Sequence, residues 1–267
     1  MYRLIALDID DTLLEAGGTI HPQNVAAIAE AQERGCAVTL VTARSWRATG
    51  QFAAQIGVTL PVICMTGATI CSPTGELLRT TPVALSDACR LAGWADAEQW
   101  VMRLYFADGR VIQSRPTSDY LNKPGANYPA ESYAGDLVSH LAGGESSIQV
   151  VVLGTRAVEG VLARLPQLPG VIATTYERGT PSARCHLLHA AVSKGAALAT
   201  LCADLGVAQS ETIAMGDGDA DISMIAWAGV GVAMGWAPAT VRQVADLVMD
   251  PADPHPVATG IRRLLCL

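Results

Sequence analysis

Short apolar runs alternate with longer stretches of helical periodicity at both ends of the chain, and this alternation constrains the fold more than any other feature. Such a pattern is typical of a parallel sheet whose strands are connected by crossover helices. The two ends therefore predict an α/β fold in which they form halves of one doubly wound, Rossmann-like sheet. The expected strands are residues 4–7, 37–41, 62–64, 212–215 and 230–233, and the expected helices are residues 22–34, 45–56 and 193–205 and a stretch ending at Ala228.

The middle of the chain, from about residue 83 to residue 189, has a different texture. Two of its strand-like runs flank Ala107-Asp108-Gly109, a hairpin signal that favours antiparallel pairing. We therefore expect a core domain of residues 1–82 and 190–267, interrupted by an α+β cap of residues 83–189, in which residues 115–135 form a long loop. The strand-like runs are residues 101–106, 110–114, 148–153, 171–176 and 185–188.

Composition limits the partners and the compartment of this protein. The formal net charge is −7 with only 18 Lys plus Arg among 267 residues, so no basic surface for nucleic acid or an anionic membrane is expected. The seven cysteines include no CxxC pair, which favours buried thiols in a reducing cytosol over disulfides or a zinc site. The first residues lack the apolar core of a signal peptide, and a cytoplasmic monomer or homodimer is expected.

One uncharged stretch, from Ile222 to Val241, is long enough to span a bilayer. Three glycines and Pro238 interrupt it, so we predict the end of a helix, a short strand and a turn there instead. No membrane segment is expected.

Two acidic clusters each follow directly after a predicted strand. Asp8, Asp10 and Asp11 follow the first strand, and Asp217 and Asp221 follow the strand that ends before Gly216. Because ligands of α/β sheets bind beyond the carboxyl ends of the strands, the clusters converge on one site if both strands are central and parallel. Their oxygens, with water, would suit Mg²⁺ far better than zinc. A solvated acidic turn or a helix cap is the alternative for the first cluster.

Thr42 and Lys194 are candidate partners for a bound anion. Thr42 follows the strand of residues 37–41 and can offer a hydroxyl and nearby backbone N–H groups. Lys194 is notable because the chain has sixteen arginines and only two lysines. An ammonium group at the start of a helix opposes the helix dipole, and an anion or carboxylate partner would relieve that. The alternatives are an ordinary loop threonine and a solvated helix-start lysine.

Five short segments together resemble the haloacid dehalogenase-like hydrolases, and within them the Cof-like phosphatases with a large inserted cap. Order and spacing agree with that family as well as residue identity, and the resemblance covers the whole chain. The segments are Asp8-Ile9-Asp10-Asp11-Thr12, Val41-Thr42-Ala43-Arg44, Thr66-Gly67-Ala68, Ser193-Lys194-Gly195 and Gly216-Asp217 through Asp221-Ile222-Ser223-Met224.

The resemblance implies that Asp8 is a nucleophile that forms an aspartyl-phosphate and that Asp10 is the general acid and base. Asp8 needs no base, since a free carboxylate is ionised at neutral pH. Asp10 must carry a proton, so we expect it to be buried beside other carboxylates or enclosed by the cap. Dehalogenases of this superfamily lack an acid two residues after the nucleophile because a halide leaves without a proton, so Asp10 favours phosphoryl transfer.

The resemblance also implies a set of binding residues. Mg²⁺ would be held by the side chains of Asp8 and Asp217 and the backbone carbonyl of Asp10, with Asp221 nearby or acting through water. The residues implied to bind the phosphoryl group are Asp11, Thr42, Ala43 and Lys194, and the candidates for contacting the rest of the substrate are Arg44, Arg184 and His186.

Several positions depart from the family pattern. Ala220 stands where Asn is usual, which removes an amide that would orient the metal site, and we expect this to affect the catalytic rate more than the fold. Thr66 replaces a usual Asn, and Ala43 and Asp11 replace usual glycines. Asp11 is expected in a left-handed conformation, which Asp tolerates better than most residues. His186 stands where an acid is frequent.

The expected function is Mg²⁺-dependent hydrolysis of small phosphorylated metabolites, such as a sugar phosphate or a cofactor-precursor phosphate, through an aspartyl-phosphate. An insert of this size covering the site would exclude macromolecular substrates unless it opens widely. Two alternatives stay open. One is a phosphomutase, which returns the phosphoryl group to its product. The other is a catalytically weakened protein that binds a phosphorylated ligand without turnover, for which Ala220 is the only sequence support.

Overall fold

The structure is a computed structural model, and it describes residues 2–14, 18–115, 132–133 and 136–266. The chain divides into two compact units, one made of Met1–Arg79 and Ser193–Leu267 and the other of Thr80–Val192. We call them the core unit and the cap unit. Each has its own cluster of buried apolar side chains. The chain therefore leaves the core unit once, builds the cap unit and returns.

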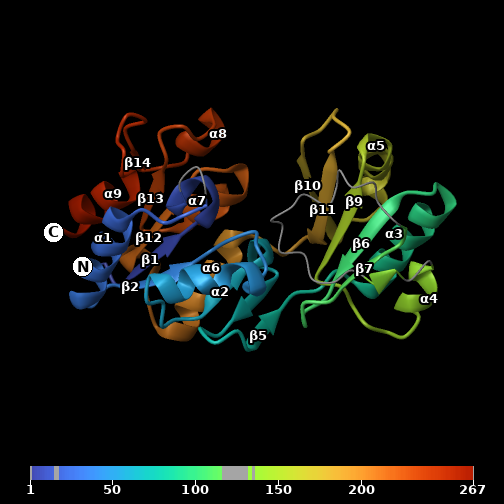
Figure 1. Ribbon diagram of the computed structural model, residues 1–267, viewed down its shortest axis with the longest axis horizontal. Coiled ribbons are helices and arrows are strands. Elements are labelled where there is room, and N and C mark those ends of the chain that lie inside the picture. Colours follow the sequence, from blue (N-terminus) through green and yellow to red (C-terminus); the bar gives the residue numbers. More distant parts are fainter. Residues whose placement is uncertain (1, 15–17, 116–131, 134–135, 267) are drawn as a thin grey trace. The chain divides into compact units, whose positions relative to one another are not determined.

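The core unit is built on a five-stranded parallel sheet in the order β14-β13-β12-β1-β2 (Figure 1). The four residues of β1 are completely buried, as expected for a strand with neighbours on both edges and helices on both faces. Leu4 lies opposite Thr212 on one side and Ala37 on the other. The predicted parallel α/β core is confirmed. Its strands are β1 (Leu4–Leu7), β2 (Ala37–Leu40), β12 (Thr212–Gly216), β13 (Val230–Ala233) and β14 (Leu247–Val248).

Helices cover both faces of this sheet (Figure 1). Leu4 and Ala6 share one apolar cluster with residues of α6 and α7. On the other face α1 packs against α9, where a Cβ added at Gly260 would lie 3.2 Å from the Met215 side chain. Side chains of successive strand residues thus pack alternately against the helices on the two faces. The helices are α1 (Pro22–Glu33), α2 (Trp46–Gln55), α6 (Lys194–Leu205), α7 (Ile222–Trp227), α8 (Ala239–Arg242) and α9 (Pro256–Leu265).

Ser193 determines where α6 begins. Its hydroxyl accepts a hydrogen bond of 3.0 Å from the backbone N–H of Ala196 and so caps the helix. The helix expected from residue 193 therefore starts one residue later, at Lys194, and it ends before Gly206, whose φ of 63° closes it in the left-handed region. Lys194 consequently occupies the first turn of α6.

The strand of residues 62–64 differs from its prediction. It was expected to continue the parallel core sheet, but β3 (Val62–Cys64) pairs antiparallel with β4 (Thr69–Cys71) in a separate three-stranded sheet completed by β5 (Leu77–Thr80). Its link to the core sheet is a single parallel bridge between Val41 and Ile63. The chain reverses between β3 and β4 through the turn Met65–Gly67, where Thr66 has a φ of 61° and Gly67 a φ of 103°.

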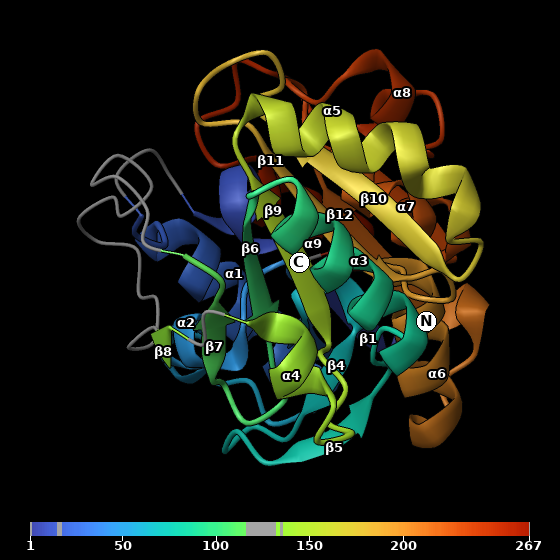
Figure 2. The same ribbon diagram turned by 90° about the vertical axis from the view of Figure 1, so that its right-hand side faces the viewer.

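The cap unit holds a six-stranded sheet in the order β10-β11-β9-β6-β7-β8, antiparallel except for the parallel pair β7–β8. Its helices lie across one face of that sheet, where Met102 and Leu104 are buried in the apolar cluster (Figure 2). The predicted antiparallel insert is confirmed. The strands are β6 (Val101–Tyr105), β7 (Val111–Gln113), β8 (Ser132–Tyr133), β9 (Gln149–Leu153), β10 (Val171–Tyr176) and β11 (Arg184–His189), and the helices are α3 (Leu85–Ala97), α4 (Leu137–Leu141) and α5 (Thr155–Arg164).

Two local predictions for the insert have different outcomes. The expected hairpin forms, because β6 and β7 pair antiparallel and the backbone N–H of Gly109 bonds to the carbonyl of Phe106 at 3.0 Å. The long loop predicted over residues 115–135 falls mostly outside the described residues. Within it, Ser132–Tyr133 form strand β8, which pairs with β7.

The uncharged stretch from Ile222 to Val241 forms α7, β13 and the first turn of α8, as predicted. Across the described ranges, none of the helices has both the length and the apolar character that crossing a membrane requires.

Candidate active site

The first acidic cluster lies in a short turn that follows β1. Asp8 is the residue after the strand, is 5 % exposed, and its backbone N–H bonds to the carbonyl of Met215 at 3.0 Å. The chain then turns through Ile9–Leu13, where Asp11 has a φ of 56°. The left-handed conformation predicted for Asp11 is therefore confirmed. Asp8 and this turn therefore place the carboxylates of the first cluster at the end of the sheet.

The second acidic cluster is a tight turn that folds back on itself after β12. One carboxylate oxygen of Asp221 accepts the backbone N–H groups of Asp217 at 3.1 Å and Gly218 at 2.9 Å. A Cβ added at Gly216 would lie 2.5 Å from the carboxylate carbon of Asp221, so only glycine lets the strand end so close to this side chain. Asp221 thus holds the turn that carries Asp217.

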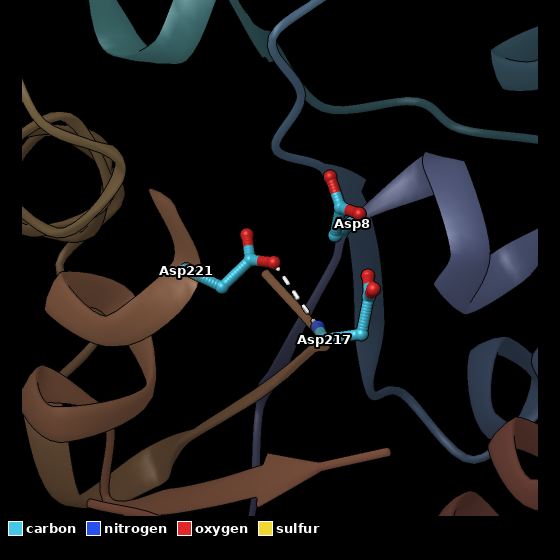
Figure 3. Close-up of side chains that lie close together, drawn as sticks. All are labelled: Asp8, Asp217 and Asp221. Atoms are coloured by element: carbon cyan, nitrogen blue, oxygen red, sulfur yellow. Dashed lines mark hydrogen bonds between the residues drawn. The ribbon is translucent and has the colours of Figure 1, made fainter. Parts of the chain in front are cut away.

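The two clusters converge, as the sequence predicted. Asp8, Asp217 and Asp221 each offer a carboxylate oxygen, and these oxygens lie within 4.8 Å of one another. Figure 3 shows the three side chains pointing toward one common space, Asp8 and Asp217 from the ends of β1 and β12 and Asp221 from the turn before α7. This follows from the register, because β1 and β12 are parallel neighbours and end side by side. Three convergent carboxylates are the donor set of a hard divalent cation, so the residues fit a metal site.

Thr12 connects the two clusters directly. Thr12 is 5 % exposed, and its hydroxyl donates a hydrogen bond of 2.9 Å to Oδ1 of Asp217. Among the described residues no hydrogen bond to Oδ2 of Asp217 is found, which leaves that oxygen for a ligand. Thr12 belongs to the first acidic motif, but this hydrogen bond was not predicted from the sequence.

Lys194 is buried between two of the carboxylates. Its Nζ lies 2.5 Å from an oxygen of Asp8 and 2.5 Å from an oxygen of Asp221, and the residue is 2 % exposed. A carboxylate partner was expected for an ammonium group at the start of a helix, and Lys194 has two. The turn before β4 supports this placement, because Gly67 packs so closely on Ser193 that a Cβ would lie 2.5 Å from the Ser193 carbonyl oxygen.

Burial dominates the charge states of the cluster. It raises the pKa of Asp8 to about 7, although the ammonium of Lys194 acts in the opposite direction, and it raises the pKa of Asp217 to about 6. Burial alone would lower the pKa of Lys194, but attraction to Asp8 and Asp221 outweighs it and raises that pKa. Full ionisation of Asp8 at neutral pH, expected from the sequence, therefore needs more positive charge than Lys194 supplies. A bound cation would provide it.

Asp10 is paired with Arg44 rather than buried. The Arg44 guanidinium donates two hydrogen bonds to the Asp10 carboxylate, at 2.8 and 2.5 Å, and lies 5.3 Å from the centre of the Phe52 ring. The Asp10 side chain is 52 % exposed. Of the two expected surroundings, burial beside other carboxylates is not found, because Ile9 takes the inward position of the turn and Asp10 points outward. Enclosure by the cap stays a prediction.

The remaining phosphate-binding candidates lie after β2. Thr42 is completely buried, its backbone N–H bonds to the carbonyl of Ile63, and its hydroxyl accepts the N–H of Arg44 at 3.1 Å. Its carbonyl accepts the N–H of Thr66 at 2.9 Å, so the segment with Ala43 is fixed against the turn before β4. Thr42 is thus held rigidly at a strand end.

The two cap candidates lie on β11 in the cap unit. Nδ1 of His186 lies 3.2 Å from Nε2 of Gln149, and its ring centre lies 4.7 Å from that of Tyr176. Burial, and then the charge of Arg184, lower the pKa of His186 to about 4. Arg184 pairs with Glu177 at 2.9 Å. At neutral pH His186 is therefore an uncharged group.

The fold and the carboxylate cluster define the class of this protein first: an α/β enzyme whose candidate site lies at the strand ends of its core sheet. Within that class the chain belongs to the haloacid dehalogenase-like hydrolases, since the model of that family matches residues 5–261. The resemblance inferred from the short motifs is confirmed.

Relatives and solved structures agree with this assignment. The chain is 25 % identical over 284 residues to phosphatase YwpJ of Bacillus subtilis (strain 168), covering 98 % of this chain and 100 % of the relative. It is 28 % identical over 259 residues to pyridoxal phosphate phosphatase YbhA of Escherichia coli (strain K12), covering 92 % and 93 %. The structure of the subclass IIB sugar phosphatase BT4131 matches with a TM-score of 0.82 at 19 % identity, covering 99 % and 100 %. The predicted fold and enzyme class, a phosphatase, are confirmed.

Proposed function

We propose that this phosphatase hydrolyses small phosphorylated metabolites with the help of Mg²⁺ and through an aspartyl-phosphate on Asp8. The observation that carries the proposal is the cluster of Asp8, Asp217 and Asp221, whose oxygens lie within 4.8 Å of one another beside the buried Lys194. A carboxylate next to fixed positive charge is suited to attack phosphorus, because the same charge stabilises the equatorial oxygens in the transition state.

The reaction has two displacements. In the first, an oxygen of Asp8 forms a bond to phosphorus while the bond to the leaving oxygen breaks, and Asp10 gives its proton to that oxygen. In the second, water attacks the phosphorus of the aspartyl-phosphate, Asp10 takes a proton from the water, and inorganic phosphate leaves Asp8 free. Asp10 thus acts as acid and then as base, and the cycle returns both residues to their starting states.

Lys194 and Thr42 bind the phosphoryl oxygens in this proposal. Lys194 is the buried cation next to Asp8, and it can exchange carboxylate oxygens for phosphoryl oxygens without leaving the site. Thr42 adds its hydroxyl at the end of β2, and the backbone N–H groups of Ala43 and Asp11 complete the set. Developing negative charge on the phosphoryl group meets fixed donors rather than water.

Mg²⁺ would be held by Asp8, Asp217 and the backbone carbonyl of Asp10. Both oxygens of Asp221 are already engaged, one with Lys194 and the other with two backbone N–H groups. We therefore place Asp221 outside the direct ligands, as the residue that orients Asp217. When bound, the ion supplies charge that neutralises the substrate and the carboxylates around it.

The ion pair between Asp10 and Arg44 has a consequence for the first displacement. While Arg44 donates to both oxygens of Asp10, neither oxygen is free to give a proton to the leaving oxygen. Proton donation therefore requires the pair to open. An anionic substrate is the natural competitor for the Arg44 guanidinium, so substrate binding would release Asp10 to take up a proton from solvent and then act as the acid.

The names of the relatives support a small metabolite as substrate. Pyridoxal phosphate and sugar phosphates are both small phosphate esters. We assign the choice among such substrates to the insert of residues 83–189, with Arg184 and His186 as candidate contacts. A cytoplasmic monomer or homodimer remains our prediction for the assembled protein.

The test uses the purified full-length chain with p-nitrophenyl phosphate, with and without Mg²⁺. Wild-type protein should release phosphate only with the metal, and Asp8→Asn should abolish the reaction. Asp219→Asn is the matched control, because Asp219 is exposed in the same acidic turn and accepts from Thr240. Equal activity of Asp8→Asn and wild type would end the proposal.

Two further observations separate the alternatives. A bisphosphorylated intermediate that returns its phosphoryl group to the product would identify a phosphomutase. Thermal stabilisation by phosphate esters without phosphate release, even at high protein concentration, would identify a binding protein without turnover.

A further inference from the structure

Trp236 is an exposed aromatic residue that touches the acidic turn of the site. Trp236 is 48 % exposed. Its indole Nε1–H donates a hydrogen bond of 2.9 Å to the carbonyl oxygen of Asp11. Burial of about half of the ring does not require its N–H to face this turn, so the hydrogen bond is the specific feature of its placement. We propose that Trp236 is a positioning residue that holds the turn Ile9–Leu13, and with it Asp10, for catalysis. The proposal rests on the function given above.

The turn needs an external support. Asp11 has a φ of 56°, in the left-handed region that residues with a side chain adopt only at a cost. An open cavity of about 500 Å³ lies beside the turn, lined by Thr12, Leu14, Asn24, Pro254, Pro256 and Trp236 itself among others. Leu13 and Leu14 are buried, whereas Asp11 is exposed beside the cavity. The hydrogen bond from Trp236 supports the turn at this exposed residue.

Trp236 is itself held by a rigid segment. The backbone N–H of Met234 bonds to the carbonyl of Gly216 at 3.0 Å, and the N–H of Ala237 bonds back to Met234 at 3.0 Å. A Cβ added at Gly235 would lie 2.4 Å from the backbone nitrogen of Pro251, so this turn is closely packed. Because Gly216 directly precedes Asp217, Trp236 connects the segment behind one acidic cluster to the turn that carries the other.

Loss of the Trp236 hydrogen bond should affect proton transfer by Asp10. The neighbour of Asp11 is Asp10, whose side chain is exposed and whose position depends on the backbone of the turn. Asp8 is fixed separately by the strand and by Lys194. Without the indole N–H we expect Asp10 to be poorly placed while Asp8 still attacks. The loss of rate should then depend on how much the leaving group needs a proton.

The experiment measures kcat/KM of Trp236→Phe and Trp236→Leu with two substrates, p-nitrophenyl phosphate and phenyl phosphate. Phenolate is the poorer leaving group and needs the proton more. Both variants remove the N–H donor, and both should lose about fivefold more activity with phenyl phosphate than with p-nitrophenyl phosphate, the effect of one hydrogen bond. Their melting temperatures should stay within about 4 °C of wild type, since the ring is half exposed.

The controls separate this proposal from the proposed function. Trp94→Phe removes an indole N–H in α3 of the cap unit and should leave the ratio between the two substrates unchanged. An unchanged ratio in both Trp236 variants, or a normal Trp236→Phe beside an impaired Trp236→Leu, would overturn the positioning role. Retained activity in Asp8→Asn would instead overturn the proposed function, whatever the Trp236 variants show.

Discussion

Thr12 illustrates how much a single residue contributes to the site. Its hydroxyl donates to Oδ1 of Asp217 across 205 positions of sequence, and it lies in the same turn as Asp10 and Asp11. Burial raises the pKa of Asp217, and the hydrogen bond from Thr12 is the interaction that opposes this most. The hydroxyl therefore both orients Asp217 and favours the anionic form that a metal ion requires.

Thr12→Val tests this role. Valine keeps the shape of the side chain but cannot donate, so the pKa of Asp217 should rise further above about 6 and its orientation should loosen. We expect the dissociation constant for Mg²⁺, measured by calorimetry at pH 7, to rise at least about tenfold. Thr200→Val is the control, because the hydroxyl of Thr200 donates to a carbonyl within α6. An unchanged Mg²⁺ affinity in Thr12→Val would contradict the role.

The residues that sequence reasoning located are those whose position follows from the sheet. Asp8 and Asp217 each come after a strand, and parallel neighbours bring strand ends together, so their convergence was predictable. The pairing of Asp10 with Arg44 was not. It depends on which residues of the turn Ile9–Leu13 point inward, and spacing along the chain carries no information about that direction.

Strand β11 shows how one element can make the cap sheet sensitive to pH. His186 lies opposite Val151 of β9, contacts Gln149, and its ring is tilted at 57° to the ring of Tyr176 of β10. Burial, followed by the charge of Arg184, lowers its pKa from 6.5 to about 4. Between these two values the unfolded chain binds a proton that the folded chain does not, so the stability of the sheet rises with pH in this window and falls as pH decreases.

His186→Gln tests the linkage. Full stability is expected above pH 6.5, and at pH 5 protonation of the unfolded state should cost the cap unit about 2 kcal/mol. Glutamine can accept from Gln149 but does not titrate, so the variant should lose this part of the pH dependence. Hydrogen exchange of the β9 and β11 amides, corrected for intrinsic rates, measures the difference. Identical pH dependence in the two proteins would show that His186 is not responsible.

At the level of elements, the periodic segments were predictable and the strained turn was not. The strands β1, β2, β12 and β13 are apolar runs bounded by polar turns, and each prediction is confirmed. Residues 62–64 have the same apolar character, yet β3 pairs antiparallel with β4 and keeps only a bridge to the core sheet. The reversal requires Thr66 at a φ of 61°. Threonine rarely adopts this conformation, so the sequence does not predict it.

The whole molecule consists of two units with separate apolar clusters. The cluster around Leu4, Leu198 and Ala214 lies in the core unit, and the cluster around Met102 and Leu104 lies in the cap unit. The candidate metal residues Asp8, Asp217 and Asp221 all belong to the core unit. A ligand that binds only the folded core unit stabilises that unit by mass action.

Mg²⁺ should therefore stabilise the two units unequally. At a hundred times its dissociation constant, the ion should raise the free energy of unfolding of the core unit by about 2.7 kcal/mol. In hydrogen exchange at fixed pH, the slowest amides of β1 and β12 should then exchange about a hundredfold more slowly, while those of β6 and β9 keep their rates. Asp217→Asn should lose the effect, and chelation should reverse it in wild type. Equal slowing in both sheets would mean that the two units unfold together. No slowing in β1 would show that Mg²⁺ does not bind at the cluster of carboxylates.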